Sequence, residues 1–175
     1  MPALGRQLVV DADIAQSAGV SLADRSRLCR ELLNAIRASL HIVVLSRQGE
    51  EEWLAHRSIY SATWFRAMEV SGQVVRVEGR LPPEVEVTVL EQFESARQPG
   101  VAKDLHLIGA ALETDRIVLS NDDRARRAMR DAAALVPDIA TIHWANPTNV
   151  EEDAAAWVTA GATDEPSGSS GSPGS

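Results

Sequence analysis

Short apolar segments alternate with longer segments of helical periodicity along this chain, and this alternation limits its fold more than any other feature. The apolar segments are rich in β-branched residues, which is typical of buried parallel strands; they cover residues 7–10, 41–45, 74–77, 116–119 and 139–144. Strands that alternate with helices favour a parallel sheet covered on both faces. We therefore predict an α/β fold, a three-layer α/β/α sandwich with a central, mainly parallel sheet of four to five strands.

The intervening segments carry apolar residues at helical spacing. Ser21 to Asp24 resembles a capped helix start, and Ile36 lies on the apolar face of the helix that follows. Gln98 to Gly100 is expected to separate two helices, because proline and glycine interrupt a helical pattern. The other expected helices cover about residues 47–70, 82–97, 102–113, 121–134 and 147–157.

The 175 residues suit one globular domain. From residue 159 onward the chain is mostly Gly, Ser, Pro, Thr and acidic residues, so we predict a domain over 1–158 and a disordered tail over 159–175. The single cysteine, Cys29, excludes an internal disulfide. No apolar run is long enough to span a membrane, and the amino terminus lacks the apolar core of a signal peptide, so a cytoplasmic location is expected.

The net charge of −8 is unevenly distributed. Residues 151–175 hold five acidic side chains and no Lys or Arg, which leaves residues 1–150 with 17 basic and 20 acidic side chains. The body of the protein is therefore close to neutral. Binding to nucleic acid would depend on a local arginine cluster and a bound cation, not on a general basic field.

Four acidic residues, Asp11, Glu52, Asp104 and Asp122, lie beside apolar segments. Asp11 and Asp122 directly follow expected strands, where an open α/β sheet presents its ligand crevice. Asp104 is expected in the first turn of its helix, and Glu52 one or two turns into the helix after the second strand. With right-handed crossovers these positions face the same end of the domain.

Carboxylates gathered at that end would repel one another unless a hard cation such as Mg²⁺ or Mn²⁺ neutralised them. Each acid taken alone can also be explained as a helix cap or first-turn residue, since an anion there stabilises the helix dipole. The order of the four acids along the chain favours a shared cation over capping alone.

The segments that carry these acids together resemble the PIN domain family. They are Val9–Asp13, Val44–Ser46 followed by Glu52, Asp104–Ala111 and Val118–Asp122. The resemblance covers about residues 7–145 and is most specific from Lys103 to Arg127, where an acid-led helix feeds a strand that ends Ser-Asn-Asp. It is weakest at Glu52, because Glu50 and Glu51 are neighbours and either could be the equivalent residue, with Glu51 the nearer competitor. Asp13 stands where the family typically has Asn or Ser.

The resemblance implies a metal-dependent endoribonuclease, like the toxin nucleases of bacterial toxin–antitoxin pairs. The implied ligands of one or two Mg²⁺ or Mn²⁺ ions are Asp11, Glu52, Asp104 and Asp122, with Asp13 as an extra ligand. Ser120 and Asn121 would brace the site by hydrogen bonds, and Asp123 would be either an auxiliary ligand or a helix cap. RNA as substrate, an antitoxin protein that blocks the acidic pocket and a homodimer are further implications.

Basic residues near the acids are candidates for contact with substrate phosphates. Arg124 and Arg127 fall on one helical face by their i, i+3 spacing, and Lys103 precedes Asp104. The same arginine face could equally be a solvated one that pairs with Asp123 and with acids further along the helix.

Two other functions stay open. A phosphatase of the haloacid dehalogenase type would use Asp11 as its nucleophile and Asp13 as acid/base; Ser46, Lys103 and the acidic pair at 122–123 match its pattern superficially, but Glu52 and Asp104 would have no role. A non-catalytic nucleic-acid-binding module with the PIN fold is the other alternative.

Overall fold

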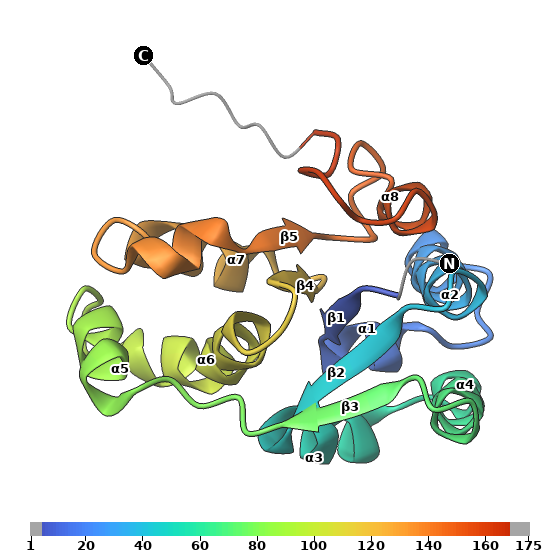
Figure 1. Ribbon diagram of the computed structural model, residues 1–175, viewed down its shortest axis with the longest axis horizontal. Helices are drawn as coiled ribbons and strands as arrows, with labels where there is room; N and C mark the ends of the chain where they lie inside the picture. Colours follow the sequence, from blue (N-terminus) through green and yellow to red (C-terminus); the bar gives the residue numbers. More distant parts are fainter. Residues whose placement is uncertain (1–4, 169–175) are drawn as a thin grey trace.

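A five-stranded, fully parallel sheet forms the centre of the computed structural model, which describes residues 5–168. Its strand order is β3-β2-β1-β4-β5 (Figure 1). The strands are β1 (Gln7–Val10), β2 (Ile42–Ser46), β3 (Val74–Val77), β4 (Ile117–Leu119) and β5 (His143–Ala145). Helices flank this sheet, so the predicted α/β sandwich with a parallel sheet is confirmed.

Successive strand residues point into two separate cores, because side chains alternate between the faces of a sheet. In β1, Leu8 and Val10 belong to one core and Val9 to the other. The first core is covered by α1 (Ala12–Ser17), α2 (Asp24–Ala38), α3 (Arg47–His56), α4 (Ile59–Val70) and α8 (Ala154–Thr159). The second is covered by α5 (Pro83–Leu90), α6 (Gln98–Leu112), α7 (Asp123–Ala132) and the 3₁₀ helix η1 (Pro137–Thr141). Within the described residues, no helix is long and apolar enough to cross a bilayer.

The strand order creates one switch point, between β1 and β4. From β1 the chain proceeds outward through β2 and β3, then returns through α5 and α6 to β4 on the other side of β1. Ligands of open α/β sheets bind beyond the carboxyl ends of the strands at such a point. The segments that follow β1 and β4 therefore frame the expected crevice.

Trp53 fixes α3 beneath β1. Its indole N–H donates to the Val10 carbonyl at 2.9 Å, and its ring stacks on Trp64 with centroids 6.0 Å apart. Trp53 is 1% exposed, so the contact is a core contact. Because Val10 immediately precedes Asp11, the same contact holds the neighbouring Glu52 near the end of β1.

Several predicted element boundaries are wrong. The expected helix over 47–70 is two helices, and Ser58 begins the second by accepting a hydrogen bond from Ser61 N–H at 3.0 Å. Pro99 lies in the first turn of α6 and does not separate two helices, because proline suits that position. Asp104 is therefore in the second turn of its helix, beyond the reach of a first-turn dipole effect. The expected strand over 139–144 divides into η1 and β5, and the last helix begins only at Ala154.

The folded chain continues beyond residue 158, where the prediction ended it. Ala162 is fully buried in the first core, and Trp157 Nε1 donates to the Asp164 carbonyl at 2.8 Å. Small, polar composition concealed this segment, because one buried alanine and one backbone acceptor leave almost no apolar signal. Residues 169–175 of the predicted tail lie outside the described residues.

Replacing Ala162 with glutamate tests whether this segment belongs to the fold. The buried carboxylate would lack a partner, so we expect the free energy of unfolding to fall by about 2–4 kcal/mol. Thr163→Glu, at an exposed neighbouring position, is the matched control and should change it by less than about 0.5 kcal/mol. Urea unfolding followed by tryptophan fluorescence measures both. Equal stability of the two variants would show that the segment does not contribute.

Candidate active site at the sheet switch point

The carboxylates of Asp11, which precedes α1, and of Asp13 in α1 converge on the hydroxyl of Ser120, which follows β4. Ser120 Oγ lies 2.8 Å from Asp11 Oδ2 and 3.3 Å from Asp13 Oδ2. The backbone N–H of Asn121 donates to Asp13 Oδ2 at 3.0 Å. These hydrogen bonds are consistent with the bracing role predicted for Ser120 and Asn121. Asn121 contributes only its backbone to them, because its side chain faces Ser17 and Cys29.

The pKa values of both carboxyl groups are raised. Burial raises the pKa of Asp11, and the hydrogen bond from Ser120 opposes that effect. Burial also raises the pKa of Asp13 to about 7, and the nearby charge of Asp11 adds to the shift. Neighbouring carboxylates in a partly desolvated site favour protonation of one of them or the arrival of a cation.

Asp104 brings a carboxylate from α6 to the same site. Burial raises its pKa to about 7; the charges of Asp11, Asp122 and Glu52 add to the shift, and Lys103 opposes it. Among the described residues, none donates a hydrogen bond to the Asp104 side chain. The acids that the sequence singled out therefore come from separate elements and act on one another electrostatically.

Glu52, not Glu51, faces this site. Glu52 Oε1 accepts from Gln48 Nε2 at 3.1 Å, and its Oε2 lies 3.8 Å from His106 Nε2 on α6. Glu51 is exposed and lies 3.6 Å from Arg47 on the outer side of α3. The contacts of α3 with α6 therefore favour Glu52 over Glu51 as a member of the acidic site.

His106 and Gln48 support Glu52, and sequence reasoning gave neither of them this role. His106 Nδ1 lies 2.6 Å from Ser46 Oγ, which also accepts from Gly49 N–H and so has its own hydrogen available for the imidazole. That leaves the Nε2 side of the ring toward Glu52. Burial lowers the pKa of His106. Gln48 also donates to the Lys103 carbonyl at 2.9 Å, and its i, i+4 spacing to Glu52 was the one available sequence signal.

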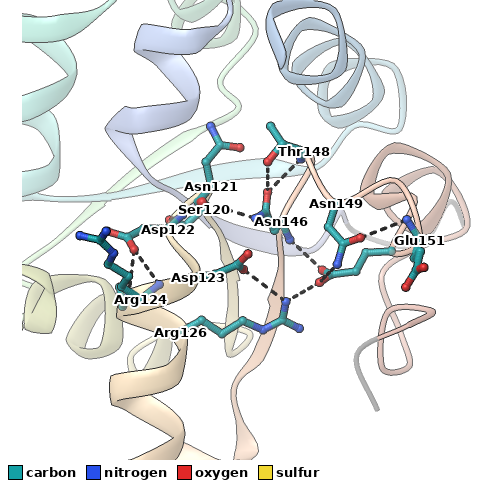
Figure 2. A network of polar contacts seen from close by, with 12 residues as sticks. Ser120, Asn121, Asp122, Asp123, Arg124, Arg126, Asn146, Thr148, Asn149 and Glu151 are labelled. Atoms are coloured by element: carbon teal, nitrogen blue, oxygen red, sulfur yellow. Dashed lines mark hydrogen bonds and ion pairs between the residues drawn. The ribbon is translucent and has the colours of Figure 1, made fainter. Parts of the chain in front are cut away.

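Asp122, not Asp123, caps α7. Asp122 Oδ1 accepts from the backbone N–H groups of Arg124 and Ala125 at 2.8 and 3.0 Å (Figure 2). Asp123 points toward Arg126, with 3.9 Å between Oδ1 and Nη1. The helix-cap role considered for Asp123 is therefore wrong, and Asp122 combines that role with membership of the acidic site.

The predicted phosphate-binding face of α7 is divided. Arg124 lines a hollow of about 300 Å³ together with Asp104 and Asp122, whereas Arg127 lines a different hollow beside Asp123. Lys103 is exposed on α6 and close enough to affect the Asp104 pKa.

Arg97 is a basic residue of the first hollow that the sequence did not indicate. Its guanidinium carbon lies 5.2 Å from the centre of the Phe93 ring, a cation–π contact that orients the side chain. Arg97 is exposed in an irregular segment, where no periodic sequence pattern could have identified it as part of the site.

The donors of this site suit a hard divalent cation in kind, because they are carboxylate oxygens. Burial and neighbouring carboxylates raise the pKa values of Asp13 and Asp104, and a bound cation would oppose both shifts. In the part of the chain that the structure describes, no three His, Cys, Asp or Glu side chains are grouped closely enough to hold a metal ion as they stand. The residues therefore fit a divalent cation by the chemistry of their donor atoms and by their location in the fold.

Comparison with known proteins adds no further constraint: no family model, no curated protein and no solved structure matches this chain. The site must be interpreted from its own residues.

Because the pKa of Asp104 is raised, we expect replacement of this residue to stabilise the protein in metal-free buffer. The folded state keeps this proton up to about pH 7, whereas the ordinary value is 3.8. Unfolding therefore releases a proton between these values, so the free energy of unfolding falls as the pH rises through that window. Asp104→Asn removes this loss.

With allowance for partial exposure, we expect Asp104→Asn to gain about 1 kcal/mol at pH 8, or about 2–4 °C in Tm. The gain should disappear near pH 4. Asp131→Asn, at an exposed position far along α7, serves as the control. Thermal unfolding with a chelator present measures both, and a gain independent of pH would contradict the charge repulsion.

Proposed function

We propose that this protein is a Mg²⁺- or Mn²⁺-dependent endoribonuclease of the PIN type. One observation carries the proposal. Four acids from separate elements, Asp11, Glu52, Asp104 and Asp122, lie within electrostatic range near the carboxyl edge of the sheet, where burial and the charges of the other three raise the pKa of Asp104. Such an arrangement destabilises the protein unless it serves a cationic ligand, and functional sites are where such perturbed carboxylates gather.

Each acid has a defined task in this proposal. Asp11, Glu52, Asp104 and Asp122 would hold the cation, with Asp13 as an additional ligand. A bound divalent cation supplies neutralising charge and a water of lowered pKa. Ser120 restrains Asp11, the end of α7 restrains Asp122, and Gln48 restrains Glu52. These restraints would hold the carboxylates in position before a cation binds.

Arg97 and Arg124 are the candidates for contact with the RNA backbone. Both line the hollow that contains Asp104 and Asp122, so a phosphate held by either would lie beside the acids. Arginine suits this task because its forked donors match phosphate oxygens. A homodimer and an antitoxin protein over the acidic edge belong to the same proposal and rest on the family resemblance alone. A cytoplasmic location is proposed from the amino-terminal sequence and the lack of a long apolar run.

The phosphatase alternative has less support from the geometry. It requires Ser46 to be available to a phosphoryl group, but the Ser46 hydroxyl is engaged by His106 Nδ1 and Gly49 N–H and is 2% exposed. It also gives no task to Glu52 or Asp104. No observation favours the non-catalytic module over the nuclease.

Neutralising Asp104 or Glu52 should abolish cleavage. We expect Asp104→Asn and Glu52→Gln each to lower Mn²⁺-dependent cleavage of a single-stranded RNA by at least about 100-fold, because loss of even an outer partner of a metal ligand costs about 10–100-fold. Glu51→Gln is the matched control and should retain activity. A fluorogenic RNA substrate measures the rates, with Tm checked for each variant.

The same variants separate the rival functions. Full cleavage by both Asp104→Asn and Glu52→Gln would exclude the proposed site. Phosphate-ester hydrolysis that survives in both but is lost in Asp13→Asn, with a phosphorylated Asp11 trapped, would identify the phosphatase.

The divided arginine face predicts unequal effects on RNA binding. Arg97→Ala and Arg124→Ala should each weaken binding and reduce the slope of log K against log salt by about 0.7, as expected for one single-strand phosphate contact. Arg127→Ala, from the other hollow, should leave the slope unchanged. Fluorescence anisotropy with the inactive Asp104→Asn protein measures these slopes without cleavage. Equal slopes in all three variants would place the RNA elsewhere.

A further inference from the structure

Arg25 lies on the opposite side of the sheet from the two arginines that were placed beside the acids. It is in the first turn of α2, whose buried residues belong to the first core. Arg97 and Arg124 lie at the starts of α6 and α7, which cover the second core. Figure 1 likewise shows α2 on one side of the sheet and α6 and α7 on the other.

Contacts through Ser17 hold Arg25 next to the acidic site. Arg25 Nε donates to Ser17 Oγ at 3.0 Å, and Asn121 Nδ2 approaches the same hydroxyl at 3.4 Å. The backbone N–H of Asn121 in turn donates to Asp13 Oδ2 at 3.0 Å. Burial raises the pKa of Asp13, and the charge of Arg25 is near enough to oppose that effect. Arg25 therefore borders the acids from the α2 side.

The guanidinium of Arg25 keeps donors available for a ligand. Arg25 is exposed, and within residues 5–168 only its Nε is engaged, while its two terminal nitrogens have no hydrogen-bond or ion-pair partner. Its neighbours on α2 differ, because Arg27 pairs with two acids and Arg30 donates to two backbone carbonyls. A guanidinium that is held at Nε presents two outer donors in the forked geometry that phosphate oxygens accept.

Charge balance alone does not explain where Arg25 lies. In the part of the chain that the structure describes, no ion pair joins Arg25 to Asp13 or to any other acid, and its nearest polar partner is a hydroxyl. A phosphodiester backbone that crossed the carboxyl edge of the sheet would meet Arg25 on one face and Arg97 and Arg124 on the other. The acids would then lie between these two sets of donors.

We propose that Arg25 binds a backbone phosphate of the RNA on one side of the scissile bond, while Arg97 and Arg124 bind phosphates on the other side. This inference rests on the proposed nuclease function and specifies how the substrate lies on the protein. The strand crosses the edge of the sheet, so nucleotides are required on both sides of the bond that is cut. Internal linkages of single-stranded RNA are therefore the substrate.

Uncharged linkages in the RNA can locate the phosphate that each arginine contacts. After the cut has been mapped in a short single-stranded RNA, a set of substrates carries one methylphosphonate at successive positions on either side of it. Each methylphosphonate follows a 2′-O-methyl nucleotide, which keeps the linkage stable. A matched set carries the same 2′-O-methyl nucleotides and ordinary phosphates. Cleavage with Mn²⁺ at substrate concentrations below KM gives kcat/KM for each protein and substrate.

With ordinary phosphates throughout, Arg25→Ala should lower kcat/KM by at least about fivefold, as expected for loss of a charge-assisted hydrogen bond. One methylphosphonate position should slow the wild-type protein by a similar factor and leave Arg25→Ala unaffected, because the variant has no partner for that charge. The corresponding positions for Arg97→Ala and Arg124→Ala should lie on the other side of the cut.

Arg27→Ala is the matched control. It removes an arginine from the same helix, but one whose guanidinium already pairs with Asp24 and Glu31. We expect it to cleave every substrate at the wild-type rate. The Tm of each variant checks that the fold is retained.

A purely structural role for Arg25 gives a different pattern. If Arg25 only kept Asp13 in place, Arg25→Ala would slow cleavage of every substrate by one common factor, and this result would overturn the inference. An unchanged rate in Arg25→Ala would overturn it too, as would a contact on the same side of the cut as those of Arg97 and Arg124. In each of these cases the wild-type protein still cleaves RNA, so the proposed function stands. Absence of Mn²⁺-dependent cleavage by the wild-type protein would instead remove the proposed function, and this inference with it.

Discussion

The hydroxyl of Ser120 joins the two halves of the site, and the electrostatics of the acidic edge depend on it. It lies 2.8 Å from Asp11 after β1 and accepts from the Asp122 N–H at 3.0 Å after β4. One small side chain therefore links the two strands that flank the switch point. Without it, only backbone donors and the charge of Arg25 would offset the repulsion between Asp11 and Asp13. The turn that presents Asp122 would also lose a local anchor.

The rest of the fold can be understood as support for this junction. Trp53 bonds to the residue before Asp11, so α3 cannot shift without moving β1. Glu152, buried behind α7, accepts from Asn146 N–H, and the Asn146 side chain reaches the Asn121 carbonyl at 3.4 Å. Apolar packing fixes one side of the acidic edge and a buried polar network fixes the other. A rigid surround of this kind keeps like charges close together at the expense of stability.

Predictions from the sequence were correct where a residue pattern is typical of one kind of structure. β-branched runs identified the strands, because such segments pack well only as buried parallel strands. The acids after β1 and β4 were placed correctly because strand direction fixes where a following residue lies. Predictions failed where position depends on partners distant in sequence. Nothing local could show that Ala162 completes the core or that Arg124 and Arg127 line different hollows. Pro99 suits either a break or the first turn of a helix, so the start of α6 at Gln98 was ambiguous.

Groups that lack a partner of opposite character lie on two sides of α7. The start of α7 carries two adjacent acidic side chains, Asp122 and Asp123, and a bound cation would offset their negative charge. On its buried face, Arg126 and nearby Trp144 hold N–H donors that have no acceptor among residues 5–168. Unpaired groups of either kind lower stability, and a single domain has little stability to lose. The acids and Arg126 lie along α7, and Trp144 lies on β5, so this part of the domain is less stable than its packing alone would allow.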